Sequence, residues 1–126
     1  MTNPATNEEE PSNVPAAVEL STSVLITTYN GERFIEQQLE SIRTQTQPAS
    51  QVLLFDDGST DGTVARVQAF IDEHALHNWR VEINPRNLGA AANTLENLKH
   101  LTGDIVFLAD QDDIWLSGKI SRSLDA

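Results

Sequence analysis

The chain has 126 residues, a formal net charge of -11 and no cysteine. This length suits one domain that can bury its own core, and the lack of cysteine excludes disulfides and thiolate chemistry. With only eight Lys and Arg residues, the chain has no basic surface of the kind that nucleic acids require, so we exclude nucleic acid as a partner.

Residues 1–20 are rich in Asn, Thr, Pro and Glu and carry too little apolar surface to pack. We expect a flexible tail there and a folded part over residues 21–126. The N-terminus lacks the basic and then apolar regions of a secretion signal, and no apolar run approaches the roughly 20 residues that span a bilayer. A cytoplasmic location is therefore expected.

The first half of the folded part predicts two strands and two helices. A strand is expected over Ser23–Thr28, followed by a helix over Glu32–Thr44 and a strand over Gln51–Phe55. The next helix runs from about Thr60 to Ala75, with Ser59, Thr60 or Asp61 as its N-cap. The residues that share the inward face of each helix are Ile35, Leu39 and Ile42 in the first and Val64, Val67 and Ile71 in the second.

In the second half, Arg80–Ile83 alternates apolar and charged residues, which predicts a strand near a sheet edge. A helix then ends at about Leu101, with Leu95 and Leu98 inward, and Ile105–Ala109 reads as a fully buried strand. The alternation of strands and helices predicts an α/β fold with a mostly parallel sheet and right-handed crossovers. Because only the start of another helix follows, we expect the chain to be a piece of a longer protein.

Three polar turns follow three of these predicted strands. They are Thr28-Tyr29-Asn30-Gly31, Asp56-Asp57-Gly58-Ser59-Thr60-Asp61-Gly62 and Asp110-Gln111-Asp112-Asp113. Each turn by itself is compatible with ordinary turn chemistry. If the strands are parallel neighbours, however, all three turns lie at the edge where open α/β sheets bind ligands. A structural edge has no need of so many carboxylates, so the coincidence favours a ligand site.

The carboxylates of Asp110 and Asp112, one residue apart, can face the same site. Oxygen ligands suit Mg²⁺ or Mn²⁺, and a substrate diphosphate would complete the coordination. His74 and His77 lie at the far end of a predicted helix and offer no zinc site. The chain also lacks a glycine-rich dinucleotide fingerprint and a phosphate loop, which disfavours dehydrogenases and P-loop nucleotidases.

The segments Val24–Asn30, Asp56–Asp61, Asn87–Gly89 and Asp110–Asp113 together resemble the N-terminal half of family 2 glycosyltransferases, which have the GT-A fold. The resemblance runs from about Ser21 to the end of the chain. It implies a Rossmann-like GT-A half, truncated, with a mostly parallel sheet and helices on both faces. It also implies inverting transfer of a sugar from a UDP- or dTDP-sugar to a polysaccharide or other glycan acceptor, with Mg²⁺ or Mn²⁺ as cofactor.

The resemblance also implies roles for individual residues. Thr27, Tyr29 and Asp57 would hold the nucleotide base, Asp110 would lie near the ribose or metal, and Asp112 would be the principal metal ligand. Further candidates are Asp113, Asn87, Gly89 and Asn93. The segment Leu108–Trp115 looks like that of members that transfer rhamnose or related sugars to bacterial surface polysaccharides. The family's general base would lie beyond Ala126.

Two other readings of the acidic turns remain open. In a haloacid-dehalogenase-like phosphatase, Asp110 would be the nucleophile and Asp112 its partner. In a non-catalytic module, the same edge would only bind a nucleotide. For the longer protein we expect a position at the inner face of the membrane, and for this chain self-association through the exposed edge of the Ile105–Ala109 strand.

Overall fold

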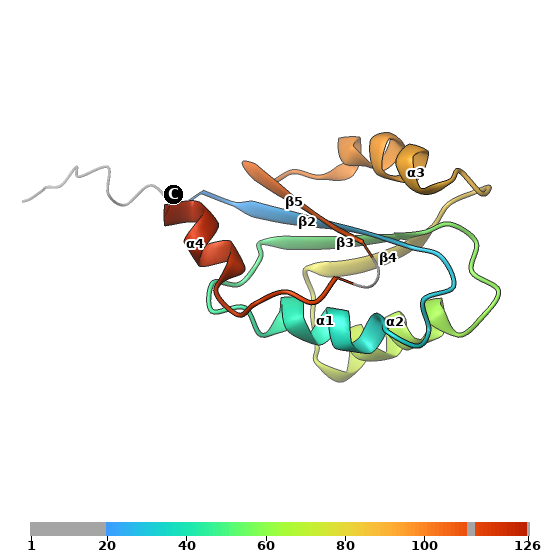
Figure 1. Ribbon diagram of the computed structural model, residues 1–126, viewed down its shortest axis with the longest axis horizontal. Coiled ribbons are helices and arrows are strands. Elements are labelled where there is room, and N and C mark those ends of the chain that lie inside the picture. Colours follow the sequence, from blue (N-terminus) through green and yellow to red (C-terminus); the bar gives the residue numbers. More distant parts are fainter. Residues whose placement is uncertain (1–19, 111–112, 126) are drawn as a thin grey trace, which may run out of the picture.

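The computed structural model describes residues 20–110 and 113–125. Its strands form one sheet in the order β4-β3-β2-β5, and every neighbouring pair is parallel, which confirms the predicted sheet (Figure 1). The strands are β2 (Thr22–Thr28), β3 (Gln51–Asp56), β4 (Trp79–Ile83) and β5 (Ile105–Asp110). β4 lies at an edge, as expected from its alternating charges. The predicted tail falls, except for Leu20, outside the described residues.

Helices cover both faces of the sheet (Figure 1). They are α1 (Ile35–Arg43), α2 (Thr63–Glu73), α3 (Ala90–Asn97), which continues into a short 3-10 turn (Leu98–His100), and α4 (Lys119–Asp125). α1 connects β2 to its neighbour β3, and α2 connects β3 to the edge strand β4. α3 then connects β4 to β5, which lies on the other side of β2. Because crossovers are right-handed, the reversed direction places α3 on the opposite face. None of the helices described here is long and apolar enough to cross a bilayer.

The main hydrophobic core lies between one face of the sheet and the helices α1 and α2 that cover it. It contains the predicted inward residues of α1, and from α2 Val67, Phe70 and Ile71. Val64, also predicted inward, is half-buried. α4 adds Ile120 to this core. The opposite face has a smaller cluster of Leu25, Leu53 and Phe55, against which Leu101 packs.

The prediction for the buried face of α3 was wrong. Leu95 is 71% exposed and Leu98 is 36% exposed, while Asn93 and Asn97 are buried. The two asparagines lie one helical turn apart, and Leu95 lies about 200° around the helix from Asn93. Hydrogen bonds with neighbouring polar groups offset the cost of burying the amides. α3 therefore packs on the sheet largely through polar contacts.

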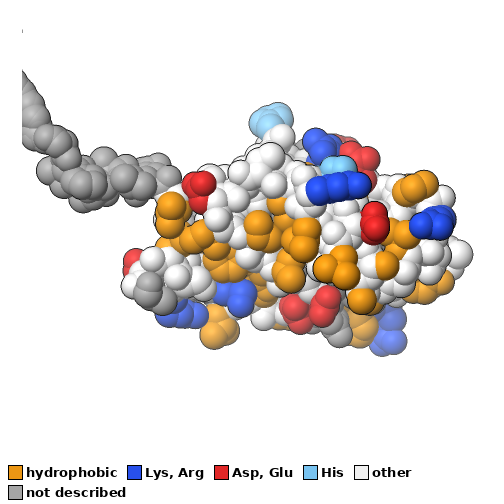
Figure 2. Space-filling view, turned by 90° about the horizontal axis from the view of Figure 1, so that it is seen from above, with side chains coloured by type: hydrophobic (Ala, Val, Ile, Leu, Met, Phe, Trp, Pro, Cys, Tyr) orange, Lys and Arg blue, Asp and Glu red, His pale blue; other side chains and the backbone are white. Residues whose placement is uncertain are grey.

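The prediction that β5 is fully buried was also wrong. Among the described strands, β5 pairs only with β2, so it lies at an edge of the sheet. Val106 is 39% exposed and Leu108 is 55% exposed, whereas Ala109 is buried. Leu108 pairs in register with Leu25 and so belongs to the face that carries α3. Figure 2 shows hydrophobic side chains gathered on this side of the molecule.

Candidate functional site

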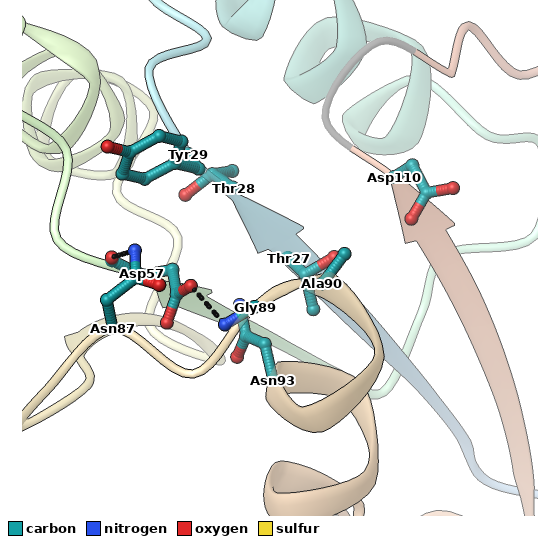
Figure 3. Close-up of a pocket in the computed structure, with 9 residues that line it drawn as sticks. All are labelled: Thr27, Thr28, Tyr29, Asp57, Asn87, Gly89, Ala90, Asn93 and Asp110. Atoms are coloured by element: carbon teal, nitrogen blue, oxygen red, sulfur yellow. Dashed lines mark hydrogen bonds between the residues drawn. The ribbon is translucent and has the colours of Figure 1, made fainter.

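A pocket of about 580 Å³ opens at the carboxyl ends of the strands (Figure 3). Its lining residues are Thr27, Thr28, Tyr29, Asp57, Asn87, Gly89, Ala90, Asn93 and Asp110. They come from the ends of β2, β3 and β5 and from the start of α3. The pocket thus draws together segments that are more than 80 residues apart in the sequence, such as Thr27 and Asp110.

The strand order explains why the pocket lies here. β3 and β4 lie on one side of β2, and β5 lies on the other side. Thr27 pairs in register with Phe55 of β3 and with Asp110 of β5, so the end of β2 lies between the two acidic turns. The strand order therefore reverses at β2, and open α/β sheets bind ligands at the carboxyl edge beside such a switch point.

Most of the predicted site residues line this one pocket. Thr27, Tyr29, Asp57, Asn87, Gly89, Asn93 and Asp110 all do so, and the sequence analysis missed only Thr28 and Ala90 among the lining residues. Figure 3 shows Tyr29 and Asp57 on one side of the pocket and Asp110 on the other. Tyr29 lines the pocket and is 48% exposed. The geometry suits a ligand that is aromatic at one end and bound to a metal cation at the other.

Asp57 is only 4% exposed and is held by several donors. Its Oδ1 accepts hydrogen bonds from the Leu88 N–H at 2.7 Å and from Asn84 Nδ2 at 3.1 Å. Its Oδ2 accepts one from the Gly89 N–H at 2.8 Å. Burial raises the pKa of this carboxyl, but the bonds from Leu88, Asn84 and Gly89 outweigh burial and bring the pKa below its usual range. Asp57 is therefore a fixed carboxylate at neutral pH.

The loop before α3 owes its shape to this carboxylate. Asn87 Nδ2 donates to the backbone oxygen of Asp57 at 3.0 Å, next to the bonds from Leu88 and Gly89. Gly89 precedes α3 with a φ of 86°, a conformation that side-chain-bearing residues rarely adopt. Asn87 and Gly89, which the sequence analysis could only name as candidates, thus line the pocket because they bond to Asp57.

Two of the predicted acidic residues have local structural roles instead. Asp56 is 1% exposed and accepts hydrogen bonds from Thr28 Oγ1, the Gly58 N–H and both the N–H and Oγ of Ser59. Asp61 accepts from the N–H and Oγ1 of Thr63, and the bond from the Thr63 hydroxyl is the main reason that its pKa is lowered. Two of the carboxylates from which a ligand site was predicted, Asp56 and Asp61, therefore shape turns.

These turn contacts also tie the first two loops together. Gly31 N–H donates to Thr63 Oγ1 at 2.9 Å, and Asn30 Oδ1 accepts from the Thr60 N–H at 2.8 Å. The loops use residues that we assigned to helices, so α1 begins at Ile35 and α2 at Thr63, each three residues later than predicted. The residue before α2 is Gly62, not one of the three predicted caps, although Asp61 does accept the Thr63 N–H.

On the opposite side of the pocket, the side chain of Asp110 is exposed at the end of β5. Its N–H donates to Asp113 Oδ2 at 3.1 Å, and its backbone oxygen accepts from Gln38 Nε2. Asp113 itself lines a separate cavity beside Trp115 and Lys119, so the described geometry does not place it in the main pocket. Asp112, the predicted principal metal ligand, lies outside the described residues.

The described residues provide only some of the oxygen ligands that a hard cation needs. Asp110 offers an exposed carboxylate, which is the ligand type that Mg²⁺ and Mn²⁺ prefer. Within residues 20–110 and 113–125, however, no cluster of three or more potential ligand side chains is present. A cation at this edge would therefore depend on the Asp110–Asp113 turn together with phosphate oxygens of a ligand.

Sequence reasoning missed two further residues beside the site, Asn84 and Asn97. Both are buried and hydrogen-bonded to the Asp57 and Asn93 region. The spacing of Asn93 and Asn97, one helical turn apart in a segment with few inward apolar residues, was the available signal.

A parallel sheet with its pocket at the switch point between β2 and β5 defines an open α/β domain, a class of fold whose ligands bind at the carboxyl edge. Residues 23–126 match the family described as Glycosyl transferase family 2, and the chain belongs to that family. The GT-A fold and the family expected from the motifs are thus confirmed.

Three known proteins illustrate the match. The dTDP-rhamnosyl transferase RfbG of Shigella flexneri is 34% identical over 102 residues, which are 78% of this chain and 35% of RfbG. The crystal structure of Staphylococcus aureus TarS 1–349 in complex with UDP is 28% identical with a TM-score of 0.74, covering 84% of this chain and 31% of that one. The mannosyltransferase PcManGT from Pyrobaculum calidifontis, in complex with GDP-Man and Mn²⁺, is 27% identical with a TM-score of 0.78, covering 86% of this chain and 32% of that one. The chain thus spans about a third of the length of these proteins.

Proposed function

We propose that this chain supplies the donor-binding part of an inverting, metal-dependent glycosyltransferase that uses a UDP- or dTDP-sugar and a glycan acceptor. The observation that carries the proposal is the pocket between Tyr29 and Asp57 on one side and Asp110 on the other. A nucleoside diphosphate fits both sides of this pocket, because its base is a flat ring that can stack on Tyr29 and its diphosphate can bind a metal beside Asp110.

For the base, the proposed contacts are stacking on Tyr29 and a hydrogen bond to Asp57. A carboxylate only accepts hydrogen bonds, and uracil and thymine offer a ring N–H where cytosine has an acceptor nitrogen. TarS was crystallised with UDP and RfbG is described as a dTDP-rhamnosyl transferase, which supports this choice. PcManGT binds GDP-Man, so GDP belongs in any comparison of donors.

For the diphosphate, we propose that Asp110 and Asp112 hold Mg²⁺ or Mn²⁺. The Mn²⁺ in the PcManGT complex supports a divalent cation in this family. The cation would stabilise the charge that develops on the departing diphosphate. Asp110 would orient the diphosphate end of the donor, while Asp57 and Tyr29 would fix the base at the other end of the pocket. We expect the base that activates the acceptor hydroxyl in segments that the longer relatives have and this chain does not cover.

The two alternative readings fare differently. A phosphatase that uses Asp110 and Asp112 has no support, because the matched family is one of glycosyl transferases. A non-catalytic nucleotide-binding module would use the same pocket. Sugar transfer by the longer protein that contains this chain would exclude the second reading.

Calorimetry with UDP tests the proposal directly. Without metal, the carboxylates of the Asp110 turn would repel the diphosphate, so we expect binding to strengthen at least tenfold when Mn²⁺ is added. Asp112→Asn should remove most of this gain, and the matched control Asp125→Asn, an exposed residue at the end of α4, should retain it. Equal UDP affinity with and without Mn²⁺ would contradict the proposed metal dependence.

A further inference from the structure

Beside Asp57 lies a cluster of three buried asparagines, Asn84, Asn93 and Asn97, of which Asn93 also lines the pocket. Their exposed fractions are 8%, 1% and 7%. Asn84 follows β4, and the other two lie on the buried face of α3. Such a polar cluster is costly to bury unless its amides are paired, and the pairing here is extensive.

The cluster forms a directed chain of hydrogen bonds that ends on the carboxylate of Asp57. Asn97 Nδ2 donates to Asn84 Oδ1 at 3.2 Å and to Asn93 Oδ1 at 2.8 Å. Asn84 Nδ2 donates to Asn93 Oδ1 at 3.0 Å and to Asp57 Oδ1 at 3.1 Å. Asn93 Nδ2 donates to the backbone oxygen of Phe55 at 3.1 Å.

The acceptors at the ends of this series of hydrogen bonds, the Asp57 carboxylate and the Phe55 carbonyl, determine the orientation of the amides. An ionised carboxylate and a backbone carbonyl can only accept, so Asn84 must present its Nδ2 to Asp57, and Asn93 must present its Nδ2 to Phe55. With Asn84 so oriented, its Oδ1 is the atom that faces Asn97, which donates to it. Each amide thus has one orientation that satisfies its neighbours.

The same bonds decide which oxygen of Asp57 remains for a ligand. Oδ1 accepts from both the Leu88 N–H and Asn84 Nδ2, which uses its two lone pairs. Among the described residues, the donor on Oδ2 is the Gly89 N–H, so Oδ2 keeps one acceptor position. Asp57 lines the pocket, and a ligand N–H would therefore meet Oδ2.

We propose that Asn84, supported by Asn97, is a positioning residue that orients the Asp57 carboxylate and thereby determines the preference for uracil or thymine over cytosine. This inference rests on the proposed function of the pocket. Without Asn84, Oδ1 would keep only the Leu88 donor, and the carboxylate could rotate toward other partners. The base N–H would then lose its oriented acceptor, while stacking on Tyr29 and the metal contacts would remain.

A purely structural role for the asparagines predicts a different result. If they only fasten α3 to the sheet, their loss would weaken the binding of every nucleotide by the same factor. The ratio of the Kd values for CDP and UDP, both measured with saturating Mn²⁺, separates the two cases, because metal and stacking contributions cancel in it.

The experiment compares this ratio in the wild type, Asn84→Ala, Asn97→Ala and Asp57→Asn. The matched control is Asn78→Ala, which removes an exposed amide that donates to the backbone oxygens of Ala49 and Ser50 at the other end of the sheet. We expect the wild type and Asn78→Ala to prefer UDP. Asn84→Ala should lower the preference about tenfold, consistent with the loss of one oriented hydrogen bond to a charged group, and Asn97→Ala should lower it less. Asp57→Asn should abolish it.

The outcomes separate the inference from the proposed function. A wild type that binds UDP and CDP equally would overturn the proposed base recognition, and the inference with it. A wild type that prefers UDP while folded Asn84→Ala keeps the full ratio would overturn the inference alone. If Asn84→Ala does not fold, as judged by its near-UV circular dichroism, an unchanged ratio in Asn97→Ala overturns the inference in the same way.

Discussion

Gln38, a fully buried residue of α1, donates its Nε2 hydrogen bond to the backbone oxygen of Asp110. The contact joins two residues that are 72 positions apart and fixes the point at which β5 turns into the acidic segment. The other amide atom of Gln38, Oε1, has no hydrogen-bond partner among the described residues. Within the described part of the chain this buried oxygen is unsatisfied, which is costly, so we infer that Gln38 contributes more to the position of Asp110 than to stability.

Gln38→Leu tests this relationship, because leucine has a similar volume and removes both amide atoms. We expect the thermal midpoint to change little, since the lost hydrogen bond and the removed unsatisfied oxygen offset each other. Mn²⁺-dependent UDP affinity should fall about fivefold, because the acidic turn loses its anchor. Gln37→Leu, on the exposed side of the same helix, is the control. A large loss of stability with unchanged affinity would show that Gln38 serves only the core.

The pKa of Asp57 gives a prediction about pH. Burial raises this pKa, and the bonds from Leu88, Asn84 and Gly89 lower it further than burial raises it. An unfolded aspartate titrates near pH 3.9, so the stability that Asp57 adds is present above about pH 4 and is lost as pH falls through its lower folded-state pKa. Carboxyl-carbon NMR should place the Asp57 midpoint below 3.9. In Asn84→Ala the midpoint should rise, and a midpoint above 3.9 in the wild type would contradict the assignment.

The exposed edge of β5 predicts self-association. Val106 and Leu108 are exposed on a strand that has one neighbour in the part of the chain described here, and such an edge can pair with another copy. We expect the mass from light scattering to rise with protein concentration. Leu108→Lys should shift the protein toward the monomer, whereas Leu95→Lys, on the outer side of α3, should not. A clean monomer at high concentration would count against this prediction.

A polypeptide of these 126 residues should bind a sugar nucleotide without transferring the sugar. After Asp113 the sequence has one further carboxylate side chain, Asp125, at the last turn of α4. General-base assistance is typically worth about 10²–10⁴-fold, and acceptor positioning contributes more, so turnover should fall below detection. A sugar-nucleotide assay with a supplied glycan acceptor measures this. Robust transfer would mean that the donor-binding part carries its own base.

The position of the site could be predicted from the sequence because it depends on local patterns. An apolar run followed by a polar turn marks where a strand ends, and helices between strands make the sheet parallel, so the turns must meet at one edge. Thr27, Tyr29, Asp57 and Asp110 follow from this reasoning together with the family motifs, and all four line the pocket. The sequence also determined the edge position of β4, through its alternating charges.

The tertiary structure alone decided what each polar side chain does. Asp56 and Asp57 are adjacent in the sequence, yet one shapes a turn and the other meets the pocket, because alternate residues of a strand end contact different neighbours. The polar face of α3 and the exposure of Leu108 likewise depend on which segments pack beside them. Hydrogen bonds such as those from Asn84 to Asp57 and from Gln38 to Asp110 span 27 and 72 positions, and no local pattern encodes such partners.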